Sequence, residues 1–184
     1  MDLIYVLYVA IGLVLGIIVL LIIHYVGDFP FPWQIRIRTA RASEPDSLAL
    51  SECFDKLSHN EEIHMVMGNV SALVCEQDIV ISSMENALEK NVVIKLVHGP
   101  EVDNRSERFL GLLRENTRVE LYEYPTYPEL HFRVLIDEEG PREVYVEEPH
   151  LPYEDHGFRC FPSRRASHEY EKIFQGILRR SARL

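Results

Sequence analysis

Three glycine-rich signatures of common enzyme classes are missing from this sequence. It contains neither GxGxxG nor GxxxxGK(S/T), and Gly68, which follows a predicted strand, is a single glycine and too little to cradle a pyrophosphate. It also lacks GxSxG, the nucleophile elbow of α/β-hydrolases. These absences argue against a nucleotide-binding domain and against a serine hydrolase of that class, and we expect no cofactor.

Cysteine is scarce as well. The chain has only three, Cys53, Cys75 and Cys160, and their spacing follows no pattern. An odd, unpatterned set excludes a disulfide framework and a cysteine-rich zinc site. The sequence therefore predicts free thiols, as expected in a reducing compartment.

A metal-ligand signature is also absent. Four potential ligands do lie close together, but zinc prefers a rigid framework with defined offsets, and these residues share a loop with two prolines and a glycine. We expect a solvated loop and no metal site for this group: His150, Glu154, Asp155 and His156.

Basic residues are outnumbered by acidic ones. The chain has 19 Lys and Arg against 29 Asp and Glu, which gives a net charge of −10. A surface that follows a phosphate backbone needs clustered Lys and Arg. The composition therefore disfavours a nucleic acid as partner.

Charge is entirely missing from residues 3–23, which are mostly Leu, Ile, Val, Ala and Tyr. About 20 apolar residues are enough for a helix to cross a bilayer. A cleaved signal peptide would need a basic start, a shorter apolar run and a small-residue cleavage site, and the sequence has none of these. We therefore expect a retained transmembrane helix over residues 1–27, with the lipid bilayer as a partner.

The flanks of this segment predict its orientation. Arg36, Arg38 and Arg41 follow it, whereas no Lys or Arg precedes it. Because positive residues stay inside, we expect a single-pass protein of the cell membrane with its N-terminus outside and a cytoplasmic C-terminal domain. Gly12 and Gly16 are four residues apart, a spacing that lets two membrane helices pair, so they are candidates for a homodimer contact.

The rest of the chain divides into a juxtamembrane linker at 28–43 and one domain at 44–184, which alternates helices and strands. A continuous run of Val and Ile at 92–97 suits a strand covered on both faces, so we expect an α/β domain with a mixed sheet flanked by helices. The apolar periodicity predicts helices at 45–57, 75–90, 105–115 and 167–181, and strands at 64–70, 92–97, 119–124, 131–137 and 143–148.

Candidate chemistry lies on the predicted hairpin of the last two strands. Strand alternation places His131 and Arg133 on one face and turns Phe132, Val134 and Ile136 into the core. A tight turn at residues 138–141 would bring Glu148 opposite His131, or Glu147 if the register shifts by one residue.

At these residues the sequence resembles the phospholipase D superfamily, whose half-domain has the same order of elements and the strand motif HxKxxxxD. The resemblance implies that His131 is the nucleophile and that Arg133 replaces the phosphate-binding Lys. It also implies that Asp137 or Glu138 stands for the motif's Asp, which orients the histidine of the other half-site. The next strand of the family tends to carry Gly-Ser and Asn, where this chain has binding candidates instead: Glu147, Glu148 and His150.

The resemblance implies a membrane-anchored phosphodiesterase that works as a homodimer, because two half-sites make one active site in this family. A small phosphodiester or a phospholipid would be its ligand. The alternative is a catalytically inactive phospholipase D-like domain that acts as a sensor or as a lipid- or protein-binding module at the membrane. In that case His131, Arg133 and Glu148 form a polar network that fixes the hairpin.

Overall fold

The computed structural model describes residues 14–16, 36–40, 44–68, 70–100, 102–103, 105–147 and 156–184. Within these residues no helix is both long and apolar enough to cross a membrane. Of the predicted transmembrane helix only residues 14–16 are described, and Gly12 lies outside the described residues. This finding contradicts the predicted fold class and location: we correct the fold to a mixed α/β domain, and the described residues do not support a single-pass topology.

The domain is built on one mixed sheet, which has eight strands among the described residues, in the order β1-β7-β6-β5-β2-β3-β4-β8. Strands β2, β3 and β4 are parallel, and every other pair is antiparallel. The strands are β1 (Arg36–Ala40), β2 (Glu62–Met67), β3 (Val93–His98), β4 (Val119–Glu123), β5 (Phe132–Asp137), β6 (Gly140–Glu147), β7 (His156–Phe161) and β8 (Ala182–Arg183).

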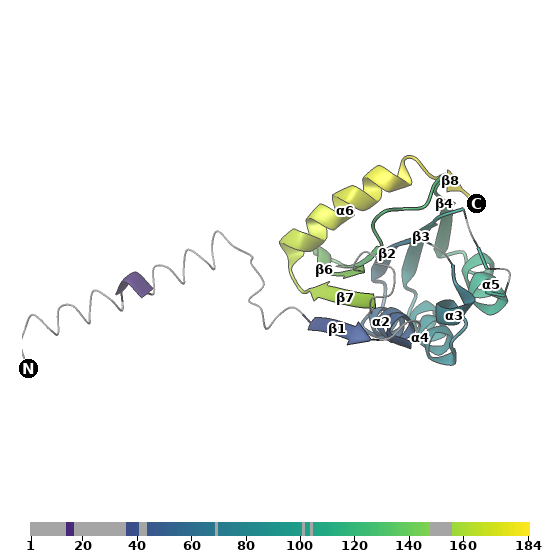
Figure 1. Cartoon of the computed structure of the whole chain (residues 1–184), viewed down its shortest axis with the longest axis horizontal. Coiled ribbons are helices and arrows are strands. Elements are labelled where there is room, and N and C mark those ends of the chain that lie inside the picture. The colour runs from purple at the N-terminus through teal and green to yellow at the C-terminus, as the bar shows by residue number, and fades with distance from the viewer. Residues whose placement is uncertain are drawn as a thin grey trace, which may run out of the picture.

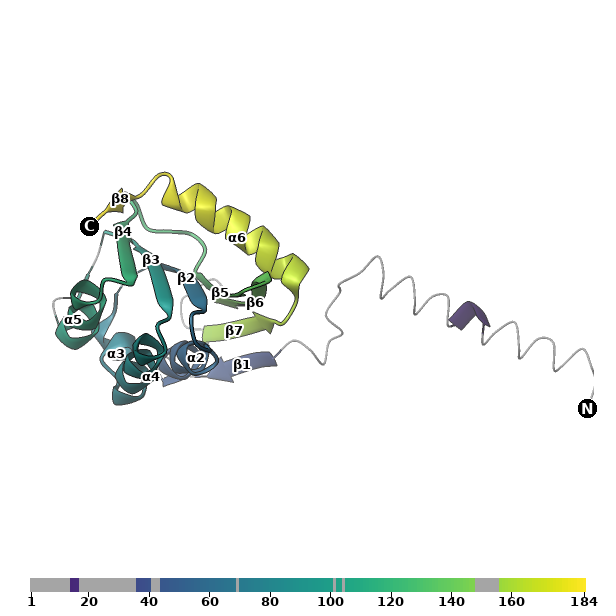
Figure 2. The same ribbon diagram turned by 180° about the vertical axis from the view of Figure 1, so that it is seen from behind.

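Helices cover both faces of this sheet (Figures 1 and 2). The longest, α6, crosses one face, and the other four lie on the opposite face. The helices are α2 (Glu44–Asp55), α3 (Ala72–Cys75), α4 (Asp78–Glu89), α5 (Glu107–Glu115) and α6 (Arg164–Leu178).

Two-sided cover explains why the central strands are apolar almost throughout. Met65 and Leu96 face the core under α2, α4 and α5, whereas Val66 and Val97 face the smaller core under α6. All four side chains are buried. The prediction of a mixed sheet from the continuous apolar run in β3 is therefore confirmed.

The structure adds strands that the sequence did not predict. β1 lies inside the segment expected to be a linker, and it pairs with β7, which lies in a stretch without a predicted element. Ile37 between Arg36 and Arg38 does follow the alternation of a strand, but the segment comes after the prolines at 30 and 32, which favour a linker, and β7 shows no regular alternation. β8 has only two residues, too few to produce any periodicity.

A buried histidine links α6 to the sheet. His64 of β2 is 3% exposed and stacks on Phe174 of α6 at a centroid distance of 4.4 Å. Its Nε2 lies 2.5 Å from a carboxylate oxygen of Glu62, and its Nδ1 lies 2.6 Å from that of Glu171. Burial opposes the charged ring, but the two carboxylates outweigh it and raise the pKa of His64 above its ordinary 6.5.

These contacts predict how stability depends on pH. A histidine whose pKa is raised by folding stabilises the fold below its unfolded pKa, and this contribution is lost as the pH rises through the folded pKa. We expect the free energy of unfolding, measured in urea, to fall as the pH rises above the ordinary histidine pKa of 6.5. His64→Gln should be less stable at the acidic end and show a flatter profile, whereas the exposed His59→Gln should keep the wild-type slope. Equal slopes in wild type and His64→Gln would contradict this account.

Candidate active site

His131 lies at the carboxyl edge of the parallel strands, immediately before β5. Pairing of β6, β5, β2 and β3 sets four side chains in a row along this edge: Glu147, His131, Met67 and His98. Sites in sheets of this kind form where the parallel strands end. The sequence alone does not indicate that His98 and His131 share this edge, because the two are far apart in the chain and only the strand order places them in one row.

Glu147 is the carboxylate opposite His131. The backbone amide of Glu147 donates to the carbonyl of His131 at 2.9 Å, and a carboxylate oxygen of Glu147 lies 3.3 Å from Nδ1 of His131. Both side chains are only 10% exposed. Of the two predicted registers, the one with Glu148 opposite His131 is therefore wrong and the one with Glu147 is confirmed. Glu148 and His150 lie outside the described residues.

The other nitrogen of the His131 ring faces the connection between β4 and β5. Nε2 lies 3.1 Å from the carbonyl oxygen of Pro128, and the ring of Tyr127 meets His131 edge-on at a centroid distance of 5.3 Å. Gly68, at the end of β2, packs against both rings so closely that a Cβ there would collide with His131 and Tyr127. His131 is consequently 9% exposed.

Arg133 lies two residues along β5 on the same face as His131, as predicted. This face is not open, however, because α2, α3 and α4 cover it, and Arg133 is 4% exposed. Its guanidinium is near Cys53 and Cys75, where burial raises the pKa of each thiol to about 12 and the charge of Arg133 partly offsets that effect. The prediction that Phe132, Val134 and Ile136 are the core-facing residues of this strand therefore misses Arg133, which is buried on the opposite face.

Asp137 and Glu138 lie at the opposite end of β5 from His131, about 20 Å away along an extended strand. Asp137 accepts two hydrogen bonds from Arg164 of α6, at 3.1 and 2.9 Å, and these lower its pKa. Glu138 follows in the turn between β5 and β6. Within one chain, the structure does not bring these two carboxylates to His131.

A second buried polar group on the same sheet face was not predicted. The carboxylate of Glu143 accepts from the ammonium of Lys56 at 2.6 Å, from Tyr145 at 3.2 Å and from the thiol of Cys160 at 2.8 Å. Burial opposes the charge of Glu143, but these donors outweigh it and lower its pKa. The group joins α2 to β6 and β7. Among the described residues no set of three or more His, Cys, Asp and Glu side chains is placed to hold a metal ion.

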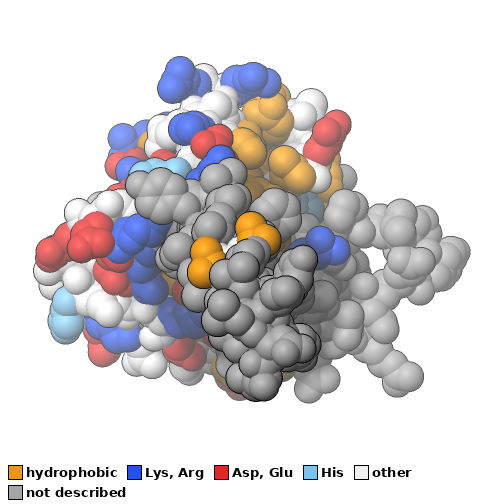
Figure 3. All heavy atoms as spheres, turned by 90° about the vertical axis from the view of Figure 1, so that its left-hand side faces the viewer, with side chains coloured by type: hydrophobic (Ala, Val, Ile, Leu, Met, Phe, Trp, Pro, Cys, Tyr) orange, Lys and Arg blue, Asp and Glu red, His pale blue; other side chains and the backbone are white. Residues whose placement is uncertain are grey.

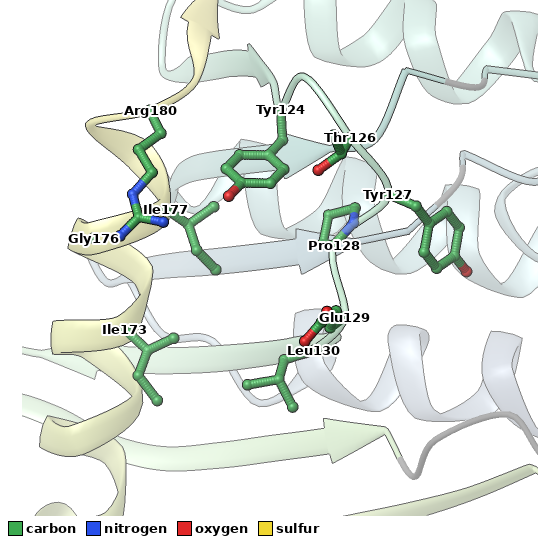
Figure 4. Close-up of a pocket in the computed structure, with 10 residues that line it drawn as sticks. All are labelled: Tyr124, Thr126, Tyr127, Pro128, Glu129, Leu130, Ile173, Gly176, Ile177 and Arg180. Carbon is green, nitrogen blue, oxygen red and sulfur yellow. The ribbon is translucent and has the colours of Figure 1, made fainter.

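A surface pocket of about 410 Å³ lies between the β4–β5 connection and α6 (Figure 4). Leu130 and Ile173 point toward one another across it, and Tyr127 points away from it. The lining residues come from this connection and from the C-terminal part of the chain around α6: Tyr124, Thr126, Tyr127, Pro128, Glu129, Leu130, Ile173, Gly176, Ile177 and Arg180.

No protein-family model and no curated protein matches the sequence. Solved structures do match the fold. NucT from Helicobacter pylori superposes with a TM-score of 0.60 at 6% identity, over 82% of this chain and 98% of NucT. Nuc from Salmonella typhimurium, a phospholipase D family member, gives 0.51 at 10% identity, over 82% of this chain and 98% of Nuc. The chain has a phospholipase D-like fold.

A third match is TrmBL2, an archaeal chromatin protein with a novel mode of DNA binding, with a TM-score of 0.59 at 12% identity. The match covers 98% of this chain but only 65% of TrmBL2. At such identities the phospholipase D-like similarity concerns the fold. On the face shown in Figure 3, the acidic and basic side chains of the described residues are interspersed.

The close packing at Gly68 predicts a position-specific loss of stability. Gly68→Ala should reduce the free energy of unfolding by about 1–3 kcal/mol, because the new methyl group has to displace the rings of His131 and Tyr127. Gly111→Ala is the matched control: it lies in α5 with open space around its Cβ, and it should stabilise the helix by about 0.5–1 kcal/mol. Urea unfolding measures both, and a Gly68→Ala protein as stable as wild type would refute the packing argument.

Proposed function

We propose that this chain is a phosphodiesterase-like hydrolase in which His131 attacks the phosphorus atom of a small phosphodiester. The contact between the Glu147 carboxylate and Nδ1 of His131, at the carboxyl edge of a phospholipase D-like fold, is the observation that carries the proposal. A carboxylate on Nδ1 favours a proton on that nitrogen, which leaves Nε2 as the nitrogen that attacks once the Pro128 carbonyl no longer accepts from it.

The chemistry proceeds in two displacements. Nε2 forms a bond to phosphorus while the ester P–O bond breaks, and the leaving oxygen takes a proton. Water then attacks phosphorus as the N–P bond breaks, and the proton that the water releases returns to the group that protonated the leaving oxygen, which frees the phosphomonoester and restores His131. The negative charge that Glu147 places near the imidazole stabilises the positive charge that the ring acquires during attack.

Arg133 has the role of a buried cation behind the nucleophile in this proposal. It shares the sheet face of His131, and a guanidinium in a site of low dielectric stabilises phosphoryl oxygens more strongly than it would in water. The acidic composition, with a net charge of −10, favours a small phosphodiester over a nucleic acid as substrate.

The nucleophile assignment predicts the effect of removing the imidazole. His131→Ala should lower the hydrolysis of bis(p-nitrophenyl) phosphate at least about a thousandfold, and Glu147→Gln should lower it about a hundredfold because the tautomer is no longer held. His59→Ala changes an exposed histidine and is the matched control. Release of p-nitrophenolate measures the rate. Hydrolysis that persists in His131→Ala would disprove the assignment.

Two copies of the chain are required if each supplies one half-site. The leaving oxygen then takes its proton from the histidine of the second copy. We expect the full chain to sediment as a dimer in analytical ultracentrifugation, and the specific activity to fall on dilution below the dissociation constant of the dimer. Activity in a strictly monomeric sample would contradict the paired half-sites, though not the assignment of His131.

A second candidate is a phospholipase D-like binding domain without catalytic activity. It is favoured by the replacement of the motif's Lys by Arg133 and by the ion pair that engages Asp137 with Arg164. This candidate requires His131→Ala and wild type to be equally inactive while both bind a non-hydrolysable phosphodiester, measured by calorimetry.

A further inference from the structure

We propose that residues 124–130, which we call the strap, form an autoinhibitory cover that keeps His131 in a non-nucleophilic state and has to swing toward α6 before the site can work. This inference rests on the proposed function, because it assigns a form of regulation to the same histidine. Its structural part, the closing and opening of the strap over His131, can be measured without any substrate.

The strap touches His131 through two neighbouring residues. The carbonyl oxygen of Pro128 lies 3.1 Å from Nε2, and the ring of Tyr127 lies edge-on to the imidazole. Nε2 is the atom that would attack phosphorus. In the closed arrangement, therefore, a phosphoryl group cannot reach it without displacing the Pro128 carbonyl.

The hydrogen-bond partner of Nε2 also decides whether this nitrogen has a free lone pair. A carbonyl oxygen can only accept, so Nε2 has to donate its N–H to Pro128. Nδ1 faces the Glu147 carboxylate, which also accepts. Because Nε2 uses its N–H in the contact with Pro128, this nitrogen has no lone pair for attack in the closed arrangement. Lifting the strap removes the acceptor at Nε2, which allows the tautomer with the proton on Nδ1, facing Glu147, and the lone pair on Nε2.

Glycines allow the strap to lie this close to the strand ends. A Cβ at Gly68 would collide with both Tyr127 and His131, and a Cβ at Gly99 would come within 3.2 Å of the Pro128 ring and collide with the carbonyl oxygen of Gly68. The strap thus lies across the carboxyl ends of β2 and β3. In its closed position the strap is closely packed against Gly68 and Gly99.

The backbone of the strap is nevertheless held by few hydrogen bonds to the rest of the domain. The amide of Tyr124 donates to the carbonyl of His98 at 2.8 Å, but among the described residues no backbone–backbone hydrogen bond involves residues 125–130. Tyr127 and Leu130 are 46% and 41% exposed. Segments with few hydrogen bonds and exposed side chains open at low free-energy cost.

Space for the movement lies on the outer side of the strap. The pocket of about 410 Å³ separates the strap from α6, and Gly176 lines it on the helix side (Figure 4). A Cβ at Gly176 meets nothing within 4 Å. Tyr124 packs against the core under α6, and the part of the strap beyond Tyr124 therefore has room to leave His131 and move toward that helix.

Two variants of the full chain act on the strap in opposite directions. Tyr127→Ala removes the ring that covers His131 and should favour the open state. Gly176→Phe fills the pocket from the helix side and should block the movement while leaving the closed contacts intact. Gly111→Phe is the matched control, because Gly111 is also a helical glycine with open space at its Cβ but lies in α5.

The readout is the acylation of His131 by diethyl pyrocarbonate at constant pH, which requires an imidazole lone pair, with peptide mass mapping and the exposed His59 as internal reference. We expect Tyr127→Ala to speed the modification of His131 about tenfold, the scale of losing one packed aromatic contact. Gly176→Phe should slow it severalfold, and Gly111→Phe should match wild type. If His131 reacts at the wild-type rate in Tyr127→Ala or in Gly176→Phe, the strap proposal is overturned.

The same variants separate this inference from the proposed function. If His131 modification follows the strap as expected but no variant hydrolyses bis(p-nitrophenyl) phosphate, the strap stands and the hydrolase proposal fails. If all variants hydrolyse the ester at the wild-type rate and His131 modification is unchanged, the strap fails and the hydrolase proposal stands. Circular dichroism on each variant ensures that folded proteins are compared.

Discussion

Cover on both faces of the central sheet is the constraint on which the rest of this structure depends. β2, β3 and β5 carry side chains into two cores, so neither face of these strands is left for solvent. A polar site can then form only where the strands end. His131 is placed there because it precedes β5, whereas Arg133, two residues further on, is already under α2 and α4.

The same constraint requires that each charge placed inside the domain be compensated. His64 lies between the carboxylates of Glu62 and Glu171, and Glu143 receives three donors. Removing one partner of such a buried group is costly, because the other charge remains in a medium of low dielectric. These groups therefore fix helices to the sheet: His64 fixes α6 and Glu143 fixes α2.

The sequence predicted the elements that bury long apolar stretches and missed those that do not. The run at β3 and the stripes of α4 and α6 are long enough to show their period, whereas β1, β7 and β8 are short and bury no long apolar stretch. The hairpin register could be predicted only to within one residue, because both Glu147 and Glu148 were compatible with the turn. The transmembrane helix was predicted from composition alone, and the helices described in the structure do not support it.

The candidate site could be predicted only in part, for a different reason. Strand alternation placed His131 and Arg133 correctly on one face, but alternation says nothing about what covers that face. The cover comes from α2, α3 and α4, which are distant in the chain, and from the β4–β5 connection. Pro128 and Tyr127 belong to no motif that would predict a contact with His131. The sequence shows Gly68 only as a glycine after a strand, and the structure explains it by the close packing of the His131 and Tyr127 rings. The contacts that shelter His131 are also those that occupy its Nε2, the atom to which the proposed function assigns the attack. Under that proposal the closed arrangement adds stability and the open one allows attack, so the free energy of a few strap contacts would set the balance between the two.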